Sequence, residues 1–345
     1  MRTLALVMLL LLLAAPAAAG DPLLVHVPAR RALLRADSGS VHLIDIASRE
    51  RIWTVPGVRH PGAIIASAAG DLAAVLDPIA NEVAVIALGS GTAVIHPIPE
   101  TPLAGEIIGD ALYVLSRDAG SVTRIDSDGS RISSALPGRA GLLLAAGGAP
   151  YVYDRVSGSI VRLDPSSLEI EASGSLPPFA SDLEAGDGTG YLVLPREGRL
   201  VAFSLESLEV TESRAAGAVP IDLQLERTAG ALSGGTLAIA DPSSKRVWRD
   251  EGAQSFGQAL ARGFLRGLLG LGLYAPQSAE FPTGVDRLFT ADRTLWGFDS
   301  ASGTLYRIEG ERARASARGV SWGSFAVADS RVWIANSEGI ESRPW

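Results

Sequence analysis

A repeat of about forty residues constrains the fold of this chain more than any other feature of its sequence. Each repeat contains an alternating apolar strand, a tight turn rich in Gly, Ser or Asn, and a second strand. Eight such hairpins follow one another, at residues 32–45, 72–88, 111–126, 151–164, 191–203, 236–248, 294–308 and from 331 onward. Equivalent positions lie 38 to 46 residues apart in five of the steps and 59 apart in the sixth.

Shorter strand patterns flank the hairpins, for example at 63–67 and 168–172. Four short antiparallel strands in a repeat of about 40 residues are typical of a propeller blade. We therefore predict an all-β chain whose residues 21–345 form a single β-propeller of four-stranded antiparallel blades. Eight hairpins favour eight blades, with seven as the alternative. In the eight-bladed form, either residues 23–27 pair with the last blade or that blade stays three-stranded.

The first twenty residues have the layout of a secretory signal peptide. A short basic start is followed by the apolar run 4–13, a proline at position 16 and the small residues 17–20. The apolar run is short for a membrane span of roughly 20 residues, and the proline interrupts it. We expect cleavage after Ala19 or Gly20 and export to the periplasm or the medium. No later segment is long and apolar enough to cross a membrane.

Composition excludes several classes of site. The chain has no Cys, so it has no disulfides, no thiolate nucleophile and no Cys-ligated metal. Its net charge is −8 and it has no basic run, which makes nucleic acid a poor partner. The zinc-protease motif and the phosphate-binding loop are missing from the sequence.

Two hairpin segments carry a resemblance to known families. Residues 39–45, Gly-Ser-Val-His-Leu-Ile-Asp, and 158–164, Gly-Ser-Ile-Val-Arg-Leu-Asp, resemble the repeat of the YVTN/NHL-type bacterial propellers. Residues 45–53, which end in Trp53, are more loosely similar to quinoprotein (PQQ)-like propellers, in which a Trp recurs in most blades and staples neighbouring blades together. Only Trp53 fits that pattern, so the resemblance implies the PQQ-like shape without the quinone cofactor.

One segment interrupts the repeat. Residues 251–283 are about twenty too many for a blade, and 255–271 have helical spacing. We predict a short helical insertion at about 252–276. Its apolar face would carry Phe256, Leu260, Phe264 and Leu268. This helix either packs on the propeller itself or docks on a partner protein, and residues 255–274 could also make peripheral contact with a membrane.

Charged residues near the expected inner strands are the candidates for ligand binding. Asp182, Asp222 and Asp286 precede inner strands at positions that match along the repeat, and Arg59 and His60 lie in a connection between blades. Three carboxylates at the channel mouth could bind Ca²⁺ or a basic ligand. The alternative is that each Asp accepts local backbone hydrogen bonds in a turn.

The sequence favours binding over catalysis, although it leaves catalysis open. We expect an exported propeller that binds a partner protein or a small ligand, with no catalytic residues and no required cofactor. The alternative is a metal-dependent hydrolase or lactonase that uses the channel carboxylates. The start of the expected mature chain, Asp-Pro-Leu-Leu at 21–24, lacks the Glu that the resemblance to propeller lactonases would require.

Overall fold

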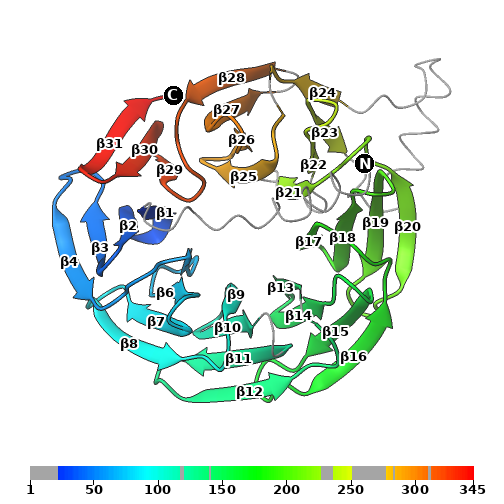
Figure 1. The fold of residues 1–345 in the computed structure, drawn as a ribbon, viewed down its shortest axis with the longest axis horizontal. Coiled ribbons are helices and arrows are strands. Elements are labelled where there is room, and N and C mark those ends of the chain that lie inside the picture. Colours follow the sequence, from blue (N-terminus) through cyan, green and yellow to red (C-terminus); the bar gives the residue numbers. More distant parts are fainter. Residues whose placement is uncertain are drawn as a thin grey trace. The chain divides into compact units, whose positions relative to one another are not determined.

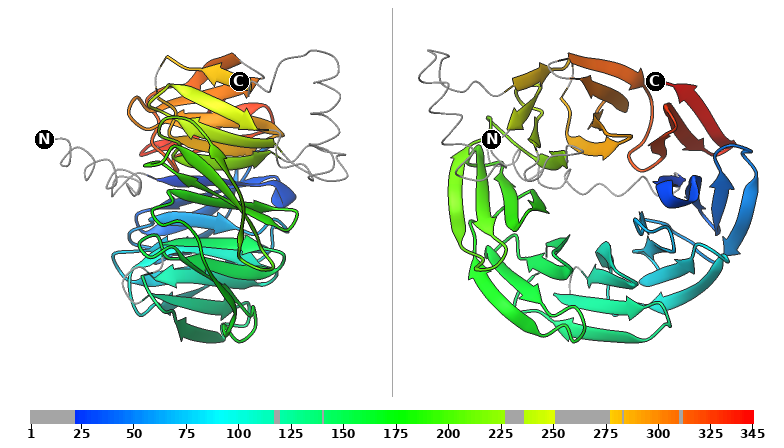
Figure 2. Two further views of the ribbon diagram at one scale, coloured as in Figure 1. Left: turned by 90° about the vertical axis from the view of Figure 1, so that its right-hand side faces the viewer. Right: turned by 180° about the vertical axis from the view of Figure 1, so that it is seen from behind.

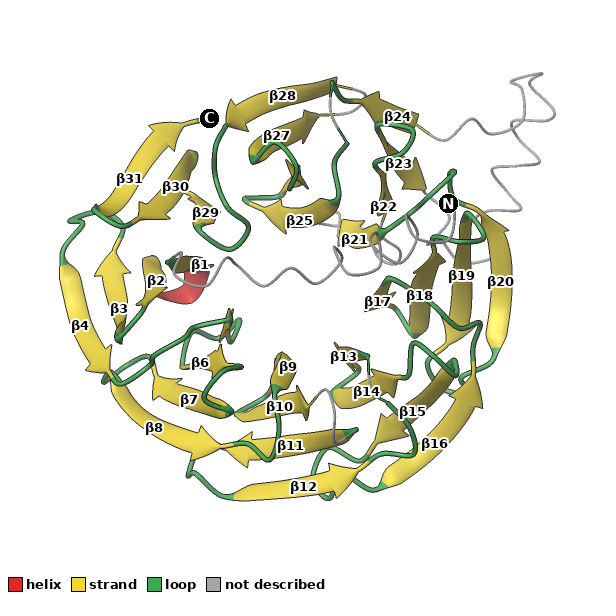
Figure 3. Ribbon diagram, viewed as in Figure 1, coloured by secondary structure: helices red, strands yellow, loops and turns green. Residues whose placement is uncertain are grey.

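The computed structural model describes residues 22–116, 120–139, 141–226, 236–250, 277–282, 284–309 and 312–345. These residues form an all-β propeller of eight blades, so eight blades is confirmed over the alternative of seven. Figure 3 shows that strands dominate and that the one helical turn among them is the 3-10 turn Pro28–Arg30. The predicted signal peptide and the helical insertion lie outside the described residues.

Each blade is an antiparallel sheet whose strands are neighbours in chain order (Figure 1). Blades 1 to 3 consist of β1 (Leu23–Val27), β2 (Ala32–Asp37), β3 (Ser40–Asp45) and β4 (Arg51–Pro56); β5 (Ala63–Ala66), β6 (Leu72–Asp77), β7 (Glu82–Ala87) and β8 (Thr92–Pro97); and β9 (Pro102–Ile108), β10 (Ala111–Ser116), β11 (Ser121–Asp126) and β12 (Arg131–Ala135).

Blade 4 consists of β13 (Leu142–Ala146), β14 (Ala149–Tyr153), β15 (Ser159–Leu163) and β16 (Ile170–Ser175). Blades 5 to 7 consist of β17 (Asp182–Gly186), β18 (Thr189–Leu194), β19 (Arg199–Ser204) and β20 (Val210–Ala215); β21 (Asp222–Glu226), β22 (Thr236–Asp241), β23 (Arg246–Asp250) and β24 (Gln277–Glu280); and β25 (Arg287–Ala291), β26 (Thr294–Asp299), β27 (Thr304–Glu309) and β28 (Arg312–Ala317). Blade 8 has three strands, β29 (Phe325–Ala328), β30 (Arg331–Asn336) and β31 (Gly339–Pro344).

The chain divides into two compact units. The first contains blades 1 to 3, blade 8 and most of blade 4. The second contains blades 5 to 7 and the remainder of blade 4. In both units the apolar core lies between successive blades, because the alternating side chains of a strand point to its two faces.

Within the first unit, the first and last blades pack side by side (Figure 2). The backbone N–H of Leu24 donates to the carbonyl of Gly323, and Arg35 Nη2 donates to the carbonyl of Asn336. Residues 23–27 form the inner strand of blade 1, and blade 8 has no fourth strand among the described residues. Of the two arrangements left open by the sequence, the structure therefore has the three-stranded last blade.

The recurring Asp residues are explained by local hydrogen bonds. Asp45 ends the third strand of its blade and Asp164 directly follows the third strand of its own, and each accepts backbone N–H groups from the turn that follows. These hydrogen bonds lower the pKa of both carboxyls. Asp77 and Asp241 end second strands, and each also binds a backbone N–H of the loop that leads into the first strand of the same blade. Asp is therefore a turn-forming residue in this repeat.

Candidate functional site

Two of the three predicted carboxylates form one largely buried polar group in the second unit. Asp182 and Asp222 are the first residues of β17 and β21, which are neighbouring inner strands. Asp182 Oδ2 accepts the backbone N–H of Leu223 at 2.8 Å, and Asp222 Oδ2 accepts the backbone N–H of Leu288. Each carboxylate thus ties its own inner strand to the inner strand of the next blade.

The two side chains also hydrogen-bond to one another. Burial raises the pKa of both carboxyls, and the negative charge of Asp182 raises the pKa of Asp222 further. Arg287 opposes both increases by its positive charge. Because the two carboxyls interact with one another, they titrate as a pair and not independently.

The third carboxylate does not occupy the matching position. In blades 5 and 6, the Asp pairs with the second-to-last residue of the second strand: Asp182 with Val193 and Asp222 with Ala240. In blade 7 that second-strand position is Phe298, and its partner is Arg287. Asp286 lies one residue earlier and accepts the N–H and the hydroxyl of Ser300. The prediction that the three Asp residues occupy matching positions was therefore wrong by one residue for Asp286, and it overlooked Arg287.

This arrangement does not favour a metal. Among the described residues, no three His, Asp or Glu side chains lie close enough together to hold an ion. The backbone N–H groups bound by Asp182 and Asp222 already occupy oxygen atoms that Ca²⁺ would need. Asp182 and Asp222 accept backbone N–H groups, as the alternative expects, but these groups belong to the next blade and not to a local turn.

Arg59 and His60 lie in the first unit, in the connection between β4 and β5. Both are exposed. The carbonyl of Arg59 accepts the hydroxyl of Ser38, and the backbone N–H of His60 donates to Asp77 Oδ2. His60 Nδ1 lies 3.6 Å from the same oxygen. The backbone of this connection is thus fixed, while both side chains stay accessible to solvent.

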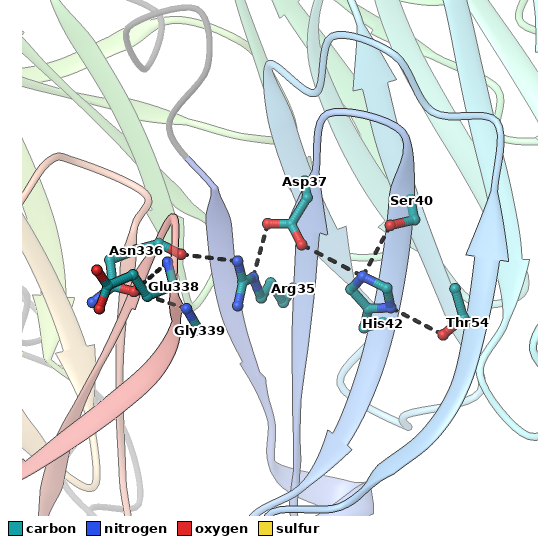
Figure 4. Close-up of polar contacts among 8 residues, drawn as sticks. All are labelled: Arg35, Asp37, Ser40, His42, Thr54, Asn336, Glu338 and Gly339. Atoms are coloured by element: carbon teal, nitrogen blue, oxygen red, sulfur yellow. Dashed lines mark hydrogen bonds and ion pairs between the residues drawn. The ribbon is translucent and has the colours of Figure 1, made fainter.

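A second polar cluster in the first unit surrounds His42 on β3 (Figure 4). His42 Nδ1 lies 3.0 Å from the hydroxyl of Thr54, and Nε2 lies 2.9 Å from the hydroxyl of Ser40 and 3.4 Å from Asp37 Oδ2. Arg35 holds the other Asp37 oxygen at 2.8 Å. His42 is only 8% exposed. Its contacts are those of a buried histidine with both ring nitrogens satisfied, which is the ordinary structural role that strand alternation predicts.

Glu106 is a half-buried acid outside the predicted site residues. It lies on β9, opposite Tyr113, in a strand that otherwise packs apolar side chains against blades 2 and 4. Burial raises its pKa from 4.5 to about 7. The signal was present in the sequence, because Glu106 is the one charged residue in the apolar run 102–108.

The second unit also presents an exposed aromatic residue in an unusual backbone conformation. Phe179 lies in the connection from β16 to β17 with φ of 66°, and 39% of it is exposed. The guanidinium of Arg196 lies 4.4 Å from the centre of its ring. The backbone N–H of Phe179 donates to the carbonyl of Arg155 at 2.7 Å, and Arg155 Nε donates to the carbonyl of Ala180 at 2.8 Å. Val156, which follows Arg155, is 63% exposed.

We call Val156, Phe179 and Arg196 the aromatic platform. A left-handed conformation costs a bulky residue about 1–2 kcal/mol, so the surrounding contacts must hold Phe179 in place. This surface was not predictable, because nothing in the Leu-Pro-Pro-Phe connection at 176–179 shows which way its aromatic ring points.

The predicted partner-binding residues Phe256, Leu260, Phe264 and Leu268 lie outside the described residues. No helix in the described part of the chain is long and apolar enough to span a membrane.

Solved structures share the fold across nearly the whole chain. BamB from Moraxella catarrhalis is 11% identical, with a TM-score of 0.63 over 94% of this chain and 98% of its own. Sqt1 from Saccharomyces cerevisiae is 11% identical, with a TM-score of 0.68 over 95% and 98% of the two chains. BBS1N, solved in complex with ARL6DN, is 13% identical, with a TM-score of 0.59 over 87% and 94%.

No family model matches the sequence, and no curated protein matches it. The YVTN/NHL type therefore stays a prediction from the repeat, while the propeller fold that the resemblance implied is confirmed. At identities of 9–14% these structures are evidence about fold alone. What they and the blade topology establish together is that this chain is a β-propeller.

Proposed function

We propose that this chain is an exported, non-catalytic β-propeller that binds a partner protein or a small ligand, and that the aromatic platform is part of its recognition surface. The observation that carries the proposal is the exposed Phe179, held in a strained conformation and stacked by Arg196. Large aromatic and Arg side chains dominate the binding energy of protein interfaces.

The platform is ready to bind without rearrangement. Its backbone is fixed on both sides by hydrogen bonds to Arg155, and Pro177 and Pro178 limit the freedom of the segment before it. A side chain that is already ordered loses less conformational entropy when a partner arrives. Such ordering in an exposed loop supports a role in recognition better than a role in folding.

The three predicted carboxylates have a structural role. Asp182, Asp222 and Asp286 each accept a backbone N–H. The complex of BBS1N with ARL6DN is a precedent for a protein partner on this fold.

Variants of the platform test the proposal. Phe179→Ala and Arg196→Ala should each weaken capture of the partner from a periplasmic or secreted protein fraction by about tenfold or more, as expected for central interface residues. Val94→Ala, at a position 51% exposed on β8, is the matched control and should leave capture unchanged. Capture that is equally strong with all three variants would refute the role of the platform.

The insertion requires its own test. Deleting residues 254–274 should abolish partner capture while leaving the β circular-dichroism spectrum intact, if the predicted helix contributes to the same surface. Unchanged capture would restrict the recognition surface to the blades.

The hydrolase alternative requires a bound divalent ion. Metal analysis of the purified protein and thermal-shift measurements with Ca²⁺ and Zn²⁺ test it, and a protein with no bound metal and no thermal shift would contradict it.

Export is tested at the N-terminus. N-terminal sequencing of protein from the periplasm or medium should begin at Gly20 or Asp21, because cleavage is expected after Ala19 or Gly20. A cell-associated protein that retains Met1 would contradict this part of the proposal.

A further inference from the structure

The free edge of blade 8 carries an inference that goes beyond the proposed function and concerns the other compact unit. Seven of the blades have four strands, whereas blade 8 has three. In the part of the chain that the structure describes, no strand pairs with the outer edge of β31. An unpaired strand edge is a template for an added strand.

The register shows which backbone groups face outward. Trp345 N–H donates to the carbonyl of Ser330, and β30 pairs with β31 so that Ile334 lies opposite Glu341. Hydrogen-bonded and non-bonded pairs alternate in an antiparallel ladder. The backbone groups of Ile340 and Ser342 therefore point away from β30, to where the other blades have a fourth strand.

The surroundings of this edge fit an acidic strand. Arg331 Nη2 donates to the carbonyl of Ser342 at 3.1 Å, and Arg49 Nη2 lies 3.3 Å from the Ser342 hydroxyl. Arg331 Nε also donates to the Ser342 hydroxyl, at 2.9 Å, so two guanidiniums meet at this residue. Arg343 follows Ser342 on β31, so its side chain points to the other face of the sheet, where it pairs with Glu341.

Complete blades of this protein show what such a strand contributes. In blade 4, Arg162 on the third strand pairs with Glu171 on the fourth, and in blade 6 Arg246 pairs with Glu280 in the same way. In both cases an acidic residue of the outermost strand neutralises an Arg of its neighbour. Blade 8 has the Arg residues without that strand.

We propose that the outer edge of β31 binds an extended segment of another protein, which adds a fourth strand to blade 8 and places an acidic side chain beside Arg49 and Arg331. Main-chain hydrogen bonds to Ile340 and Ser342 provide the affinity, and the guanidiniums provide the selectivity for acid. The incoming backbone N–H replaces Arg331 at the Ser342 carbonyl and frees that guanidinium for the acidic side chain.

A synthetic peptide tests this directly. The probe is a fluorescein-labelled peptide with the sequence of residues 209–217, EVTESRAAG, which is the fourth strand of blade 5 with its flanks. Fluorescence anisotropy should show saturable binding to the full chain. A second peptide in which the glutamate that corresponds to Glu212 is replaced by lysine should bind at least about tenfold more weakly, a difference of about 1.4 kcal/mol.

Two substitutions at one position separate strand addition from other binding. Ser342→Pro removes a backbone N–H that does not pair with β30. It should therefore preserve the hairpin but lower the affinity for the peptide by about tenfold or more. Ser342→Ala keeps the N–H and should bind like the unsubstituted protein. Equal binding by both variants, or no binding by either peptide, would overturn the proposal.

Two further measurements complete the test. NMR amide exchange on the unsubstituted protein should show that the peptide protects Ile340 and Ser342, and this result does not depend on whether Ser342→Pro folds. Sedimentation velocity tests whether a second copy of this chain occupies the edge instead. A dimer that the unsubstituted protein forms and Ser342→Pro abolishes would mean that a second copy of this chain fills the edge, and it would overturn the foreign acidic strand.

Discussion

Trp53 donates its indole N–H to the carbonyl of Leu88 at 3.2 Å, across the seam between blades 1 and 2. A Cβ added at Gly91 would lie 2.7 Å from Trp53 Cγ, so a residue without a side chain lets the indole ring lie against the turn. One Trp of the quinoprotein-like pattern thus joins two blades, as the resemblance implies, although the pattern does not recur at the equivalent positions of the other blades.

This contact predicts a graded loss of stability. Trp53→Phe keeps most of the ring and loses the hydrogen bond, which should lower the free energy of unfolding by about 1 kcal/mol. Trp53→Ala also loses the packing and should cost about 2–3 kcal/mol, because the side chain is only half-buried. Urea denaturation measures both. Ile52→Ala is the control on the same strand, at a position 54% exposed, and should stay within about 0.5 kcal/mol.

Glu106 makes the stability of the first unit depend on pH near neutrality. Its pKa is about 7 in the folded chain and near 4.5 when unfolded. Because the folded value is raised, the stability that the neutral acid provides is fully present below pH 4.5 and is lost as pH rises through about 7. Glu106→Gln should therefore be more stable than the unsubstituted protein at pH 8.5, by roughly 2–3 kcal/mol.

Denaturation midpoints between pH 5 and pH 8.5 measure this effect. The difference between Glu106→Gln and the unsubstituted protein should grow with pH. Glu50→Gln, which changes an exposed carboxylate, should give a constant difference. Parallel curves for Glu106→Gln would contradict the burial of an acid at this position.

The fold was largely predictable because each blade repeats the same local pattern. Alternating residues and turn-forming Gly and Asp define the hairpins independently of tertiary contacts, and the eight hairpins found in the sequence coincide with the second and third strands of the eight blades. The closing arrangement was not predictable, because residues 23–27 have the same apolar alternation whether they pair with β2 or with the last blade.

The candidate site was less predictable, because its geometry depends on register. Asp286 and Arg287 are adjacent in sequence, and only the pairing of β25 with β26 shows that Arg287 occupies the position of Asp182 and Asp222. Phe179 could not be found at all, since its exposure depends on a backbone conformation that propensities disfavour for an aromatic residue.

At Leu208 we predict that a Gly substitution is more stable than an Ala substitution, the reverse of the usual order. It lies in the turn between β19 and β20 with φ of 58°, and it is 1% exposed. Both Leu208→Ala and Leu208→Gly lose the buried side chain, at a cost of about 2–5 kcal/mol. Gly, however, adopts a positive φ without strain, so Leu208→Gly should be more stable than Leu208→Ala by about 1 kcal/mol.

Leu200 provides the matched comparison, because it is also 1% exposed but lies within β19 in extended backbone. There, Gly should be less stable than Ala by about 0.5–1 kcal/mol. The same order at both positions would show that the backbone of Leu208 carries no strain. Chemical denaturation of the four variants gives the comparison.

The His42 cluster predicts a loss of stability in acid. Burial lowers the pKa of His42 from its usual 6.5, and the charge of Arg51 lowers it further, although Asp37 opposes both effects. Because the folded value is depressed, the stability that neutral His42 provides is present above pH 6.5 and is lost as pH falls through the folded pKa. Protonation of His42 would make both ring nitrogens donors, so the hydroxyl oxygens of Ser40 and Thr54 would both have to accept a hydrogen bond from the ring.

His42→Gln should therefore lower the stability of the protein at pH 7.5 and reduce the dependence of that stability on pH between 7 and 5. Urea midpoints measured at each pH for His42→Gln and the unsubstituted protein compare these outcomes, and identical pH profiles would assign the acid sensitivity to other groups.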